Sequence, residues 1–164
     1  MKLLIKQNPN LFKTSFTITD EAGNVRYTVN GETFSLGHKL HIFDTCGNEV
    51  GFIREKTWSW NATFFIDIMG ENVGMIKKEF SWIKPKYNID FLDWYVEGDW
   101  SGYNYNVYSK GENVANISQK VWTWNDTYML DIINPEDELY ALMLVLSIDA
   151  VKASQTACVT AANM

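Results

Sequence analysis

The two histidines of this chain, His38 and His41, are the first candidates for chemistry, because histidine is a common general base and metal ligand. They lie three positions apart where the sequence predicts a turn leading into a strand. A zinc site would need two further ligands, and Asp44 and Cys46 are the nearest candidates. These four positions do not share one face of a strand, whose side chains alternate. We therefore expect no metal site here.

Five acidic residues could in principle supply the paired carboxylates of general acid–base catalysis: Asp20, Glu21, Asp67, Asp131 and Asp149. Two of them, Asp67 and Asp131, occupy equivalent places in an internal repeat, which indicates one structural role used twice. The sequence contains no nucleophile elbow, phosphate-binding loop or dinucleotide fingerprint. We expect turn or strand-edge roles for these carboxylates, no cofactor and no enzymatic activity. An enzyme with an unrecognised site remains the alternative.

Tryptophan occurs twice as a Trp-x-Trp pair, at Trp58 and Trp60 and again at Trp122 and Trp124. Residues i and i+2 of a strand share one face, so each pair could form an aromatic platform for a sugar or a lipid. The favoured expectation is that the pairs pack under a barrel wall or cover its ends. The same alternatives apply to Trp82, Trp94 and Trp100.

Four lysines, Lys77, Lys78, Lys84 and Lys86, fall within ten residues and are interleaved with aromatic residues that include Trp82. This basic segment contrasts with the rest of an acidic chain. It could contact anionic lipid headgroups or another anionic ligand. The favoured expectation is a solvated hairpin without a ligand, in which Glu79 offsets one of the charges.

The composition excludes several classes of partner. The chain has 164 residues and a net charge of −6, which makes it a poor nucleic-acid binder. Its two cysteines, Cys46 and Cys158, form no metal-binding or disulfide framework. The apolar run near the N-terminus, residues 3–5, is too short for the hydrophobic region of a signal peptide. We expect reduced thiols and a cytoplasmic location, with peripheral contact to a membrane as an option.

Alternation of apolar and polar residues from 15 to 133, with a turn signal about every ten residues, predicts twelve antiparallel strands. The predicted strands are 15–20, 25–30, 32–36, 39–45, 50–59, 63–69, 73–82, 86–91, 93–98, 104–110, 113–121 and 127–133. Segments 47–68 and 111–132 are repeats at an offset of 64 residues, identical at 10 of 22 positions. A barrel with pseudo-symmetric halves accounts for both features.

The period changes after position 133 to that of a helix near 135–152. Asn134 suits the N-cap, Pro135 the first helical position, and acidic residues 136–138 the first turn. Eleven of the next thirteen residues are apolar on every face, so the helix must be surrounded by apolar material. A membrane span needs about 20 such residues. The sequence therefore predicts a helix buried inside the barrel and no transmembrane segment.

Five short motifs follow one another at the N-terminal side: Asp20–Gly23, Tyr27–Gly31, Phe34–Gly37, Leu40–Asp44 and Gly47–Ile53. Their order and spacing resemble the LURP-one-related family of the tubby C-terminal-like group, over roughly 2–152. The resemblance implies a twelve-stranded closed barrel around a central hydrophobic C-terminal helix. Related groups bind phosphoinositides or act on membrane phospholipids, but no motif here aligns with the tubby phosphoinositide residues.

These observations predict one all-β domain over 1–152 with a single buried helix, followed by a flexible tail at 153–164. The leading functional hypothesis is a non-enzymatic binding or scaffold domain. The principal alternative is a module that contacts phospholipid or phosphoinositide at a membrane surface through the lysine segment.

Overall fold

The computed structural model describes residues 1–8, 14–32, 37–59, 61–79, 86–99, 102–119 and 127–162, and within them all side chains except those of 78–79, 86–87 and 154–162. It contains strands, one short 3-10 helix and one long α-helix. The strands are β1 (Lys2–Gln7), β2 (Ser15–Asp20), β3 (Val25–Gly31), β4 (Lys39–Phe43), β5 (Glu49–Glu55), β6 (Thr63–Ile68), β7 (Glu71–Glu79), β8 (Lys86–Phe91), β9 (Trp94–Asp99), β10 (Asn104–Ser109), β11 (Glu112–Gln119) and β12 (Thr127–Ile132). The helices are η1 (Pro135–Asp137) and α1 (Glu138–Ala162).

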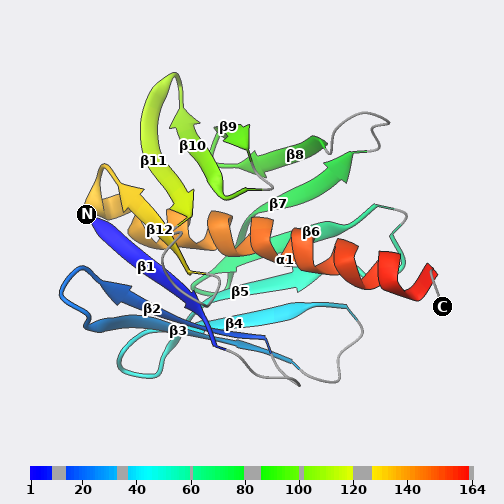
Figure 1. Cartoon of the computed structure of the whole chain (residues 1–164), viewed down its shortest axis with the longest axis horizontal. Coiled ribbons are helices and arrows are strands. Elements are labelled where there is room, and N and C mark those ends of the chain that lie inside the picture. The colour runs from blue at the N-terminus through cyan, green and yellow to red at the C-terminus, as the bar shows by residue number, and fades with distance from the viewer. Residues whose placement is uncertain are drawn as a thin grey trace.

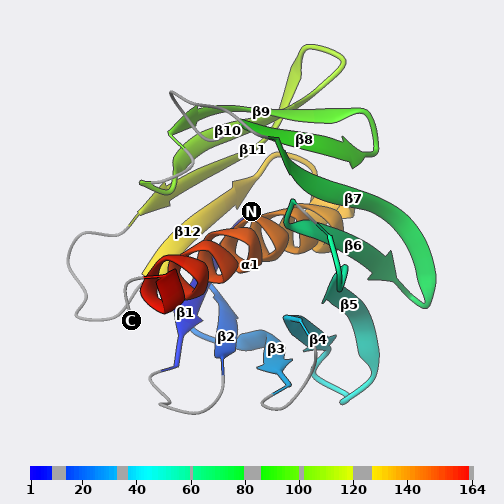
Figure 2. The same cartoon turned by 90° about the vertical axis from the view of Figure 1, so that its right-hand side faces the viewer.

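All twelve strands form one antiparallel sheet in the order β8-β7-β6-β5-β4-β3-β2-β1-β12-β11-β10-β9. Strands next to each other in sequence pair with each other except β8 and β9, and the first strand, β1, also pairs with the last, β12. The sheet curls into a barrel, as Figure 2 shows. Its two edge strands are β8 and β9, so the predicted barrel is confirmed in a nearly closed form.

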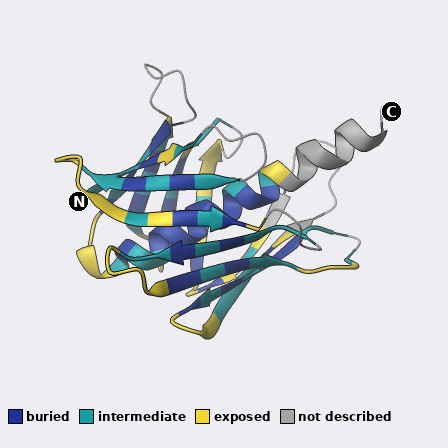
Figure 3. Cartoon of the chain, turned by 90° about the horizontal axis from the view of Figure 1, so that it is seen from below, coloured by how far each residue is buried: buried dark blue, intermediate teal, exposed yellow. Residues whose placement is uncertain are grey.

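Helix α1 lies inside this barrel, with strands on every side of it (Figures 1 and 2). Ala141 through Ile148 are each no more than 1% exposed, which confirms the predicted buried helix. The polar member of this run, Ser147, donates a hydrogen bond of 2.8 Å to the carbonyl of Met143, so its hydroxyl is satisfied within the helix. In Figure 3 the helix is dark blue within the strands and changes to yellow as it leaves them.

The two copies of the internal repeat form equivalent hairpins on the two sides of α1. One copy supplies β5 and β6, the other β11 and β12, and β6 and β12 have the same alternation of buried and intermediate positions. Gly51 of β5 packs so closely on the helix that a Cβ there would lie 2.4 Å from the sulfur of Met143. Its repeat equivalent is the fully buried Ala115, so both copies present a small residue in the wall.

An ion pair fixes the start of α1 to the barrel wall. The guanidinium of Arg26 on β3 donates to both carboxylate oxygens of Glu138, with Nη2 at 3.1 and 2.9 Å. Glu138 is the first residue of α1 and its side chain is only 11% exposed. The pair therefore sets where the helix enters the barrel.

Several boundaries differ from the sequence-based prediction; the predicted strand 50–59, for example, ends at Glu55. Strand β1 was not predicted, because Leu3 and Ile5 face the core while Leu4 between them is also apolar and hides the alternation. The predicted strand 32–36 is not found at Glu32, and 33–36 lie outside the described residues. The α-helix begins three residues later than predicted, after η1, where Asn134 makes no side-chain cap bond, and it continues to Ala162.

The helical end of the chain follows from its composition. The segment expected to be a flexible tail contains no proline or glycine to end the helix and is rich in alanine. Among the helices of the described residues, none has the length and hydropathy needed to cross a membrane.

Candidate functional site

Several basic and aromatic side chains lie where β5 ends, β6 begins and β7 ends, near the C-terminal end of α1 (Figure 1). The backbone amide of Lys56 donates to the carbonyl of Thr63 at 2.7 Å, and Thr63 pairs in register with Lys77. The three residues therefore form one row across adjacent strands. Both lysines are exposed, whereas Thr63 between them is 5% exposed.

Trp58 lies in the connection between β5 and β6, two residues after Lys56, and is 95% exposed. Its backbone has φ of 61°, a left-handed conformation that a bulky residue rarely adopts. The expectation that this tryptophan packs under the wall or over the barrel end is therefore wrong. Its indole leaves a large, partly apolar surface in contact with water, which a binding partner could cover.

A neighbouring row on the outer face places a third basic residue, Arg54, over an aromatic ring. The guanidinium carbon of Arg54 lies 4.6 Å from the centroid of the Phe65 ring, and Phe65 pairs in register with Met75. Arg54 also donates from Nε to Asp67 at 3.2 Å. We call Arg54, Lys56, Trp58, Phe65 and Lys77 the basic–aromatic rim.

Few acidic side chains oppose this positive charge in the described residues. Asp67 is paired with Arg54, and it also accepts a bond of 2.7 Å from Asn72. Glu55 turns to the other side, where it accepts from the amide of His38 and lies 2.9 Å from its Nδ1. The neighbouring strand β8 contributes one exposed carboxylate, Asp90, which pairs in register with Met75 of β7.

The lysine segment predicted from the sequence overlaps this rim only in part. Lys77 is exposed and belongs to it. The backbones of Lys78 and Lys86 lie in β7 and β8, which are paired, so the predicted hairpin is present. The side chains of Lys78 and Lys86, and the whole of Trp82 and Lys84, lie outside the described residues.

The other tryptophans divide between the core and the undescribed segments. Trp94 is 6% exposed and packs edge-on against Phe91, with ring centroids 5.5 Å apart. The remaining predicted members lie outside the described residues: Trp60, Trp82, Trp100, Trp122 and Trp124.

Each histidine lies within hydrogen-bonding distance of glutamate carboxylates, His41 on the outer face of the barrel and His38 beside Glu55 on the other side. His41 has Nε2 3.1 Å from Glu32 and Nδ1 3.1 Å from Glu49, while His38 contacts Glu55. Hydrogen bonds from Lys39 and His41 lower the pKa of Glu32. In the described part of the chain, no group of three or more His, Cys, Asp or Glu side chains is arranged to hold a metal ion.

Two of the predicted carboxylate and ligand candidates fix their own turns. Asp20 accepts from the amides of Ala22 and Asn24, each at 2.9 Å, and Asp44 does the same for Cys46 and Asn48 at 2.9 and 2.8 Å. These hydrogen bonds lower the pKa of both aspartates. Asp44 is therefore engaged in its turn, and Cys46 is exposed beside it.

The repeat equivalents Asp67 and Asp131 do not have the same surroundings. The residue that corresponds to Arg54 in the second copy is Ser118, so Asp131 cannot form the ion pair that Asp67 forms. The prediction of one role used twice does not extend to this contact. Asp131 instead pairs in register with Lys2 and Asn116.

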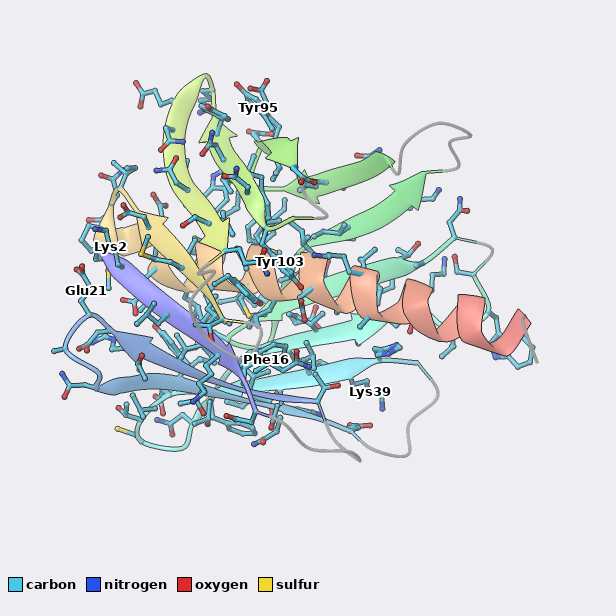
Figure 4. All side chains as sticks on the ribbon, in the orientation of Figure 1. Lys2, Phe16, Glu21, Lys39, Tyr95 and Tyr103 are labelled. Atoms are coloured by element: carbon cyan, nitrogen blue, oxygen red, sulfur yellow. The ribbon has the colours of Figure 1, made fainter. Side chains whose placement is uncertain are left out.

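Asp149 is the one predicted carboxylate that lies on the helix, and it contacts a cluster of tyrosines. Tyr103 donates its hydroxyl to Asp149, stacks on Tyr128 at 4.6 Å between centroids, and has the Nζ of Lys152 3.1 Å from its ring centroid. Burial and the nearby Asp149 raise the pKa of Tyr105. Figure 4 shows Tyr103 beside α1, so this cluster ties the C-terminal half of the helix to the wall.

The sequence-based analysis singled out two members of the basic–aromatic rim, Lys77 and, as one alternative for the Trp-x-Trp pair, Trp58, and it missed Arg54, Lys56 and Phe65. A signal for the rim was present in the alternation, since Arg54 and Lys56 share one strand face, as do Met75 and Lys77. What the sequence could not show is the register that places Lys56 and Lys77 on either side of Thr63. The arrangement offers positive charge beside exposed aromatic surface, which suits an anionic partner with an apolar interior.

Comparisons with known proteins agree with the fold. The family model of the LURP-one-related proteins matches residues 1–149. A curated relative, "Uncharacterized protein YxjI" from Bacillus subtilis (strain 168), is 32% identical over 152 residues, which cover 92% of this chain and 93% of the relative. The X-ray structure of a protein from Arabidopsis thaliana matches with a TM-score of 0.61 at 20% identity over 90% of each chain, and this likeness shows the fold alone. The chain belongs to the LURP-one-related family.

Proposed function

We propose that this protein is a non-enzymatic binding module that docks on anionic phospholipid surfaces through the basic–aromatic rim. The observation that carries the proposal is the 95% exposure of Trp58, two residues after the exposed Lys56, which lies in one row with the exposed Lys77. Tryptophan favours the interface between lipid and water, where its indole is partly apolar and its N–H remains hydrated. Each lysine near an anionic membrane contributes roughly 1 kcal/mol of attraction.

The buried helix supports a site on the outside of the barrel. Because α1 fills the lumen with side chains from Ala141 to Ile148, the centre of the barrel is occupied by the chain itself. A ligand must then be met at the outer wall or the barrel ends. The basic–aromatic rim is at such an end, where α1 emerges between the strands (Figure 1).

Charge distribution would also orient the molecule. The chain as a whole carries a net charge of −6, so a negative membrane repels most of its surface and attracts the rim. We place this interaction at the cytoplasmic face of a membrane, the leaflet that carries most anionic lipid. The protein would bind peripherally and reversibly.

The test is flotation of the full chain with vesicles of neutral phosphatidylcholine, with or without phosphatidylserine, at low and high salt. We expect binding only to the anionic vesicles, weakened by salt. Reversing two charges with Lys56→Glu and Lys77→Glu should lower the apparent affinity by at least about tenfold, because attraction becomes repulsion. Trp58→Ala should weaken binding even at low salt.

A matched control reverses two lysines at the opposite end of the barrel, Lys2→Glu and Lys110→Glu, and should leave flotation nearly unchanged. A further variant reverses Lys78, Lys84 and Lys86, which measures the rest of the predicted segment separately. No flotation with anionic vesicles at low salt would refute the proposal. Equal loss in the rim variant and the control would show that attraction is not localised to the rim.

A further inference from the structure

Strands β8 and β9 are the two free edges of the sheet although they follow each other in the chain. Only Leu92 and Asp93 separate them, with φ of 51° and 56°, the conformation of a two-residue hairpin turn. Such a turn normally joins two paired strands. Here β8 pairs with β7, β9 pairs with β10, and the two share no ladder in the part of the chain that is described.

A strand edge carries unpaired backbone N–H and C=O groups and can template another strand. The seam between β8 and β9 offers two such edges, each six residues long. They are held together only at the turn, where Phe91 and Trp94 are buried against each other and Phe91 lies 6.2 Å from the ring of Tyr140 on α1. The turn end of the seam is therefore anchored on the helix.

The side chains along the seam alternate in a way that defines what could fit between them. The residues that face outward are exposed and mostly acidic: Asn88, Asp90, Tyr95, Glu97 and Asp99. The residues that face inward are apolar and half-buried or buried: Ile89, Phe91, Trp94 and Val96. Segment 86–99 contains four carboxylates and a single lysine.

We propose that the β8–β9 seam binds an extended peptide segment whose side chains alternate between basic and apolar. Its backbone would add to a sheet edge, the general mode of β-strand addition. Its apolar side chains would contact Ile89 and Val96, and its basic side chains would meet Asp90 and Glu97. Tyr95, stacked on Tyr108 at 5.3 Å between centroids, borders the same edge on the outer face (Figure 4).

The charges favour this partner over a second copy of the chain. Two copies joined edge to edge would bring the carboxylates of one seam against those of the other, and like charges directly opposite are destabilising. A basic strand turns the same carboxylates into attractive cross-strand pairs. The seam also lies on other strands than the rim, so its test is independent of the proposed membrane binding.

The probe is a synthetic seven-residue peptide of alternating Lys and Val with blocked ends, fluorescently labelled and titrated with the full-length protein. An equivalent Glu/Val peptide controls for charge, and a Lys/Val peptide N-methylated at alternate amides controls for backbone pairing. We expect binding of the Lys/Val peptide only, together with slower amide exchange in 86–99. Before the peptide is added, exchange in these strands should be faster than in β1 or β12.

Charge reversal gives the specificity test. In a variant with Asp90→Lys and Glu97→Lys the preference should switch, with the Lys/Val peptide weakened by about tenfold and the Glu/Val peptide now bound. Glu21→Lys with Glu49→Lys, in the turn after β2 and on β5, lies away from the seam and should keep the original preference. Thermal unfolding of both variants confirms that they are folded.

Several results would overturn the proposal. The first is no binding of the Lys/Val peptide, and the second is equal binding of its N-methylated form. Slow exchange of 86–99 in the free protein would show that the edges are already covered. Slow exchange that appears only as protein concentration rises, with a dimer in solution, would assign the seam to a second copy instead.

Discussion

At the scale of single residues, the contact between Gly51 and Met143 limits how closely the wall and the helix approach. A Cβ at position 51 would lie 2.4 Å from the sulfur and 2.8 Å from the methyl carbon of Met143. Those atoms belong to the far end of a flexible side chain, so they can move at some cost. The repeat equivalent Ala115 shows that a methyl group fits the same place in the other hairpin.

We therefore predict that Gly51→Ala destabilises the fold by about 1–3 kcal/mol through overpacking. Shortening the opposing side chain in a Gly51→Ala, Met143→Ala double variant should cost less than the sum of the two single changes. Urea unfolding of the four proteins measures this coupling. Purely additive costs would show that the two side chains do not meet.

Asp20 and Asp44 give the protein an acid-sensitive pair of turns. Hydrogen bonds to Asn24 and Asn48 hold the pKa of each carboxyl below its ordinary value of 3.8. A lowered folded-state pKa means that the stabilisation is present above the unfolded pKa and is lost as pH falls through the folded one. The sensitive range therefore lies below about pH 4.

We expect the urea midpoint of the protein to fall as pH drops from about 4 towards 2, partly because the carboxylates of Asp20 and Asp44 become protonated. Asn keeps the turn acceptor without titrating, so an Asp20→Asn, Asp44→Asn variant should lose less stability over that range. Carboxyl carbon NMR shifts give the two pKa values directly. A midpoint whose pH dependence is the same in both proteins would contradict this role.

At the scale of elements, the Arg26–Glu138 pair connects the first residue of α1 to β3. The glutamate side chain is 11% exposed whereas the arginine side chain is 44% exposed, so removing the arginine leaves a nearly buried carboxylate without this partner. Its loss should be costlier than that of a surface pair. The hydrogen bonds that the Arg26 guanidinium donates to Glu138 raise the pKa of the arginine.

Arg26→Met should destabilise the protein by about 1–3 kcal/mol, because Glu138 then loses its charged hydrogen-bond donor. Changing both residues, as Arg26→Met with Glu138→Leu, should recover much of this loss by removing the unpaired charge. Thermal or urea unfolding measures both. A double variant as unstable as Arg26→Met would show that the ion pair itself, rather than the isolated charge, holds the helix in place.

How far the sequence predicts these elements depends on whether a local pattern carries the information. The buried helix is predictable because an apolar surface on every side admits few surroundings, and the strands because their alternation is regular. Strand β1 was missed because Leu4 interrupts the alternation of Leu3 and Ile5. The open β8–β9 seam could not be predicted, since the turn at Leu92–Asp93 favours a paired hairpin.

The candidate site likewise contains residues that a local sequence pattern reveals and residues that only the fold brings together. Lys77 was found from the local density of lysines, a property of the sequence alone. Lys56 and Trp58 join it only through the register that pairs β5 with β6 and β6 with β7. Tryptophan composition likewise favours burial, and the exposure of Trp58 depends on the path of its connection.

At the scale of the whole molecule, the barrel and α1 stabilise each other. The buried side chains of the strands form one core with helix residues 141–148, which are almost fully enclosed. Without the helix those side chains would line a cavity wide enough for water, and the sheet would have no core. A chain ending at Ile133 should therefore fail to unfold cooperatively and should expose apolar surface to a dye such as ANS.

A second experiment adds a synthetic peptide of residues 135–164, which contains α1, to the chain that ends at Ile133. We expect partial recovery of near-UV circular dichroism from the buried aromatic residues. A shortened chain that is soluble and unfolds in one cooperative transition would contradict the role of the helix as the core of the barrel.

The functional claim is that the barrel end around Trp58 meets anionic lipid while the buried core stays intact. The most direct measurement is fluorine NMR of the protein labelled with 5-fluorotryptophan, on vesicles that contain anionic lipid and a spin-labelled lipid. Trp58, assigned by its loss in Trp58→Phe, should broaden strongly, while Trp94, 6% exposed in the core, should not. Vesicle-bound protein in which the Trp58 resonance is unchanged, or broadens no more than that of Trp94, would contradict the claim.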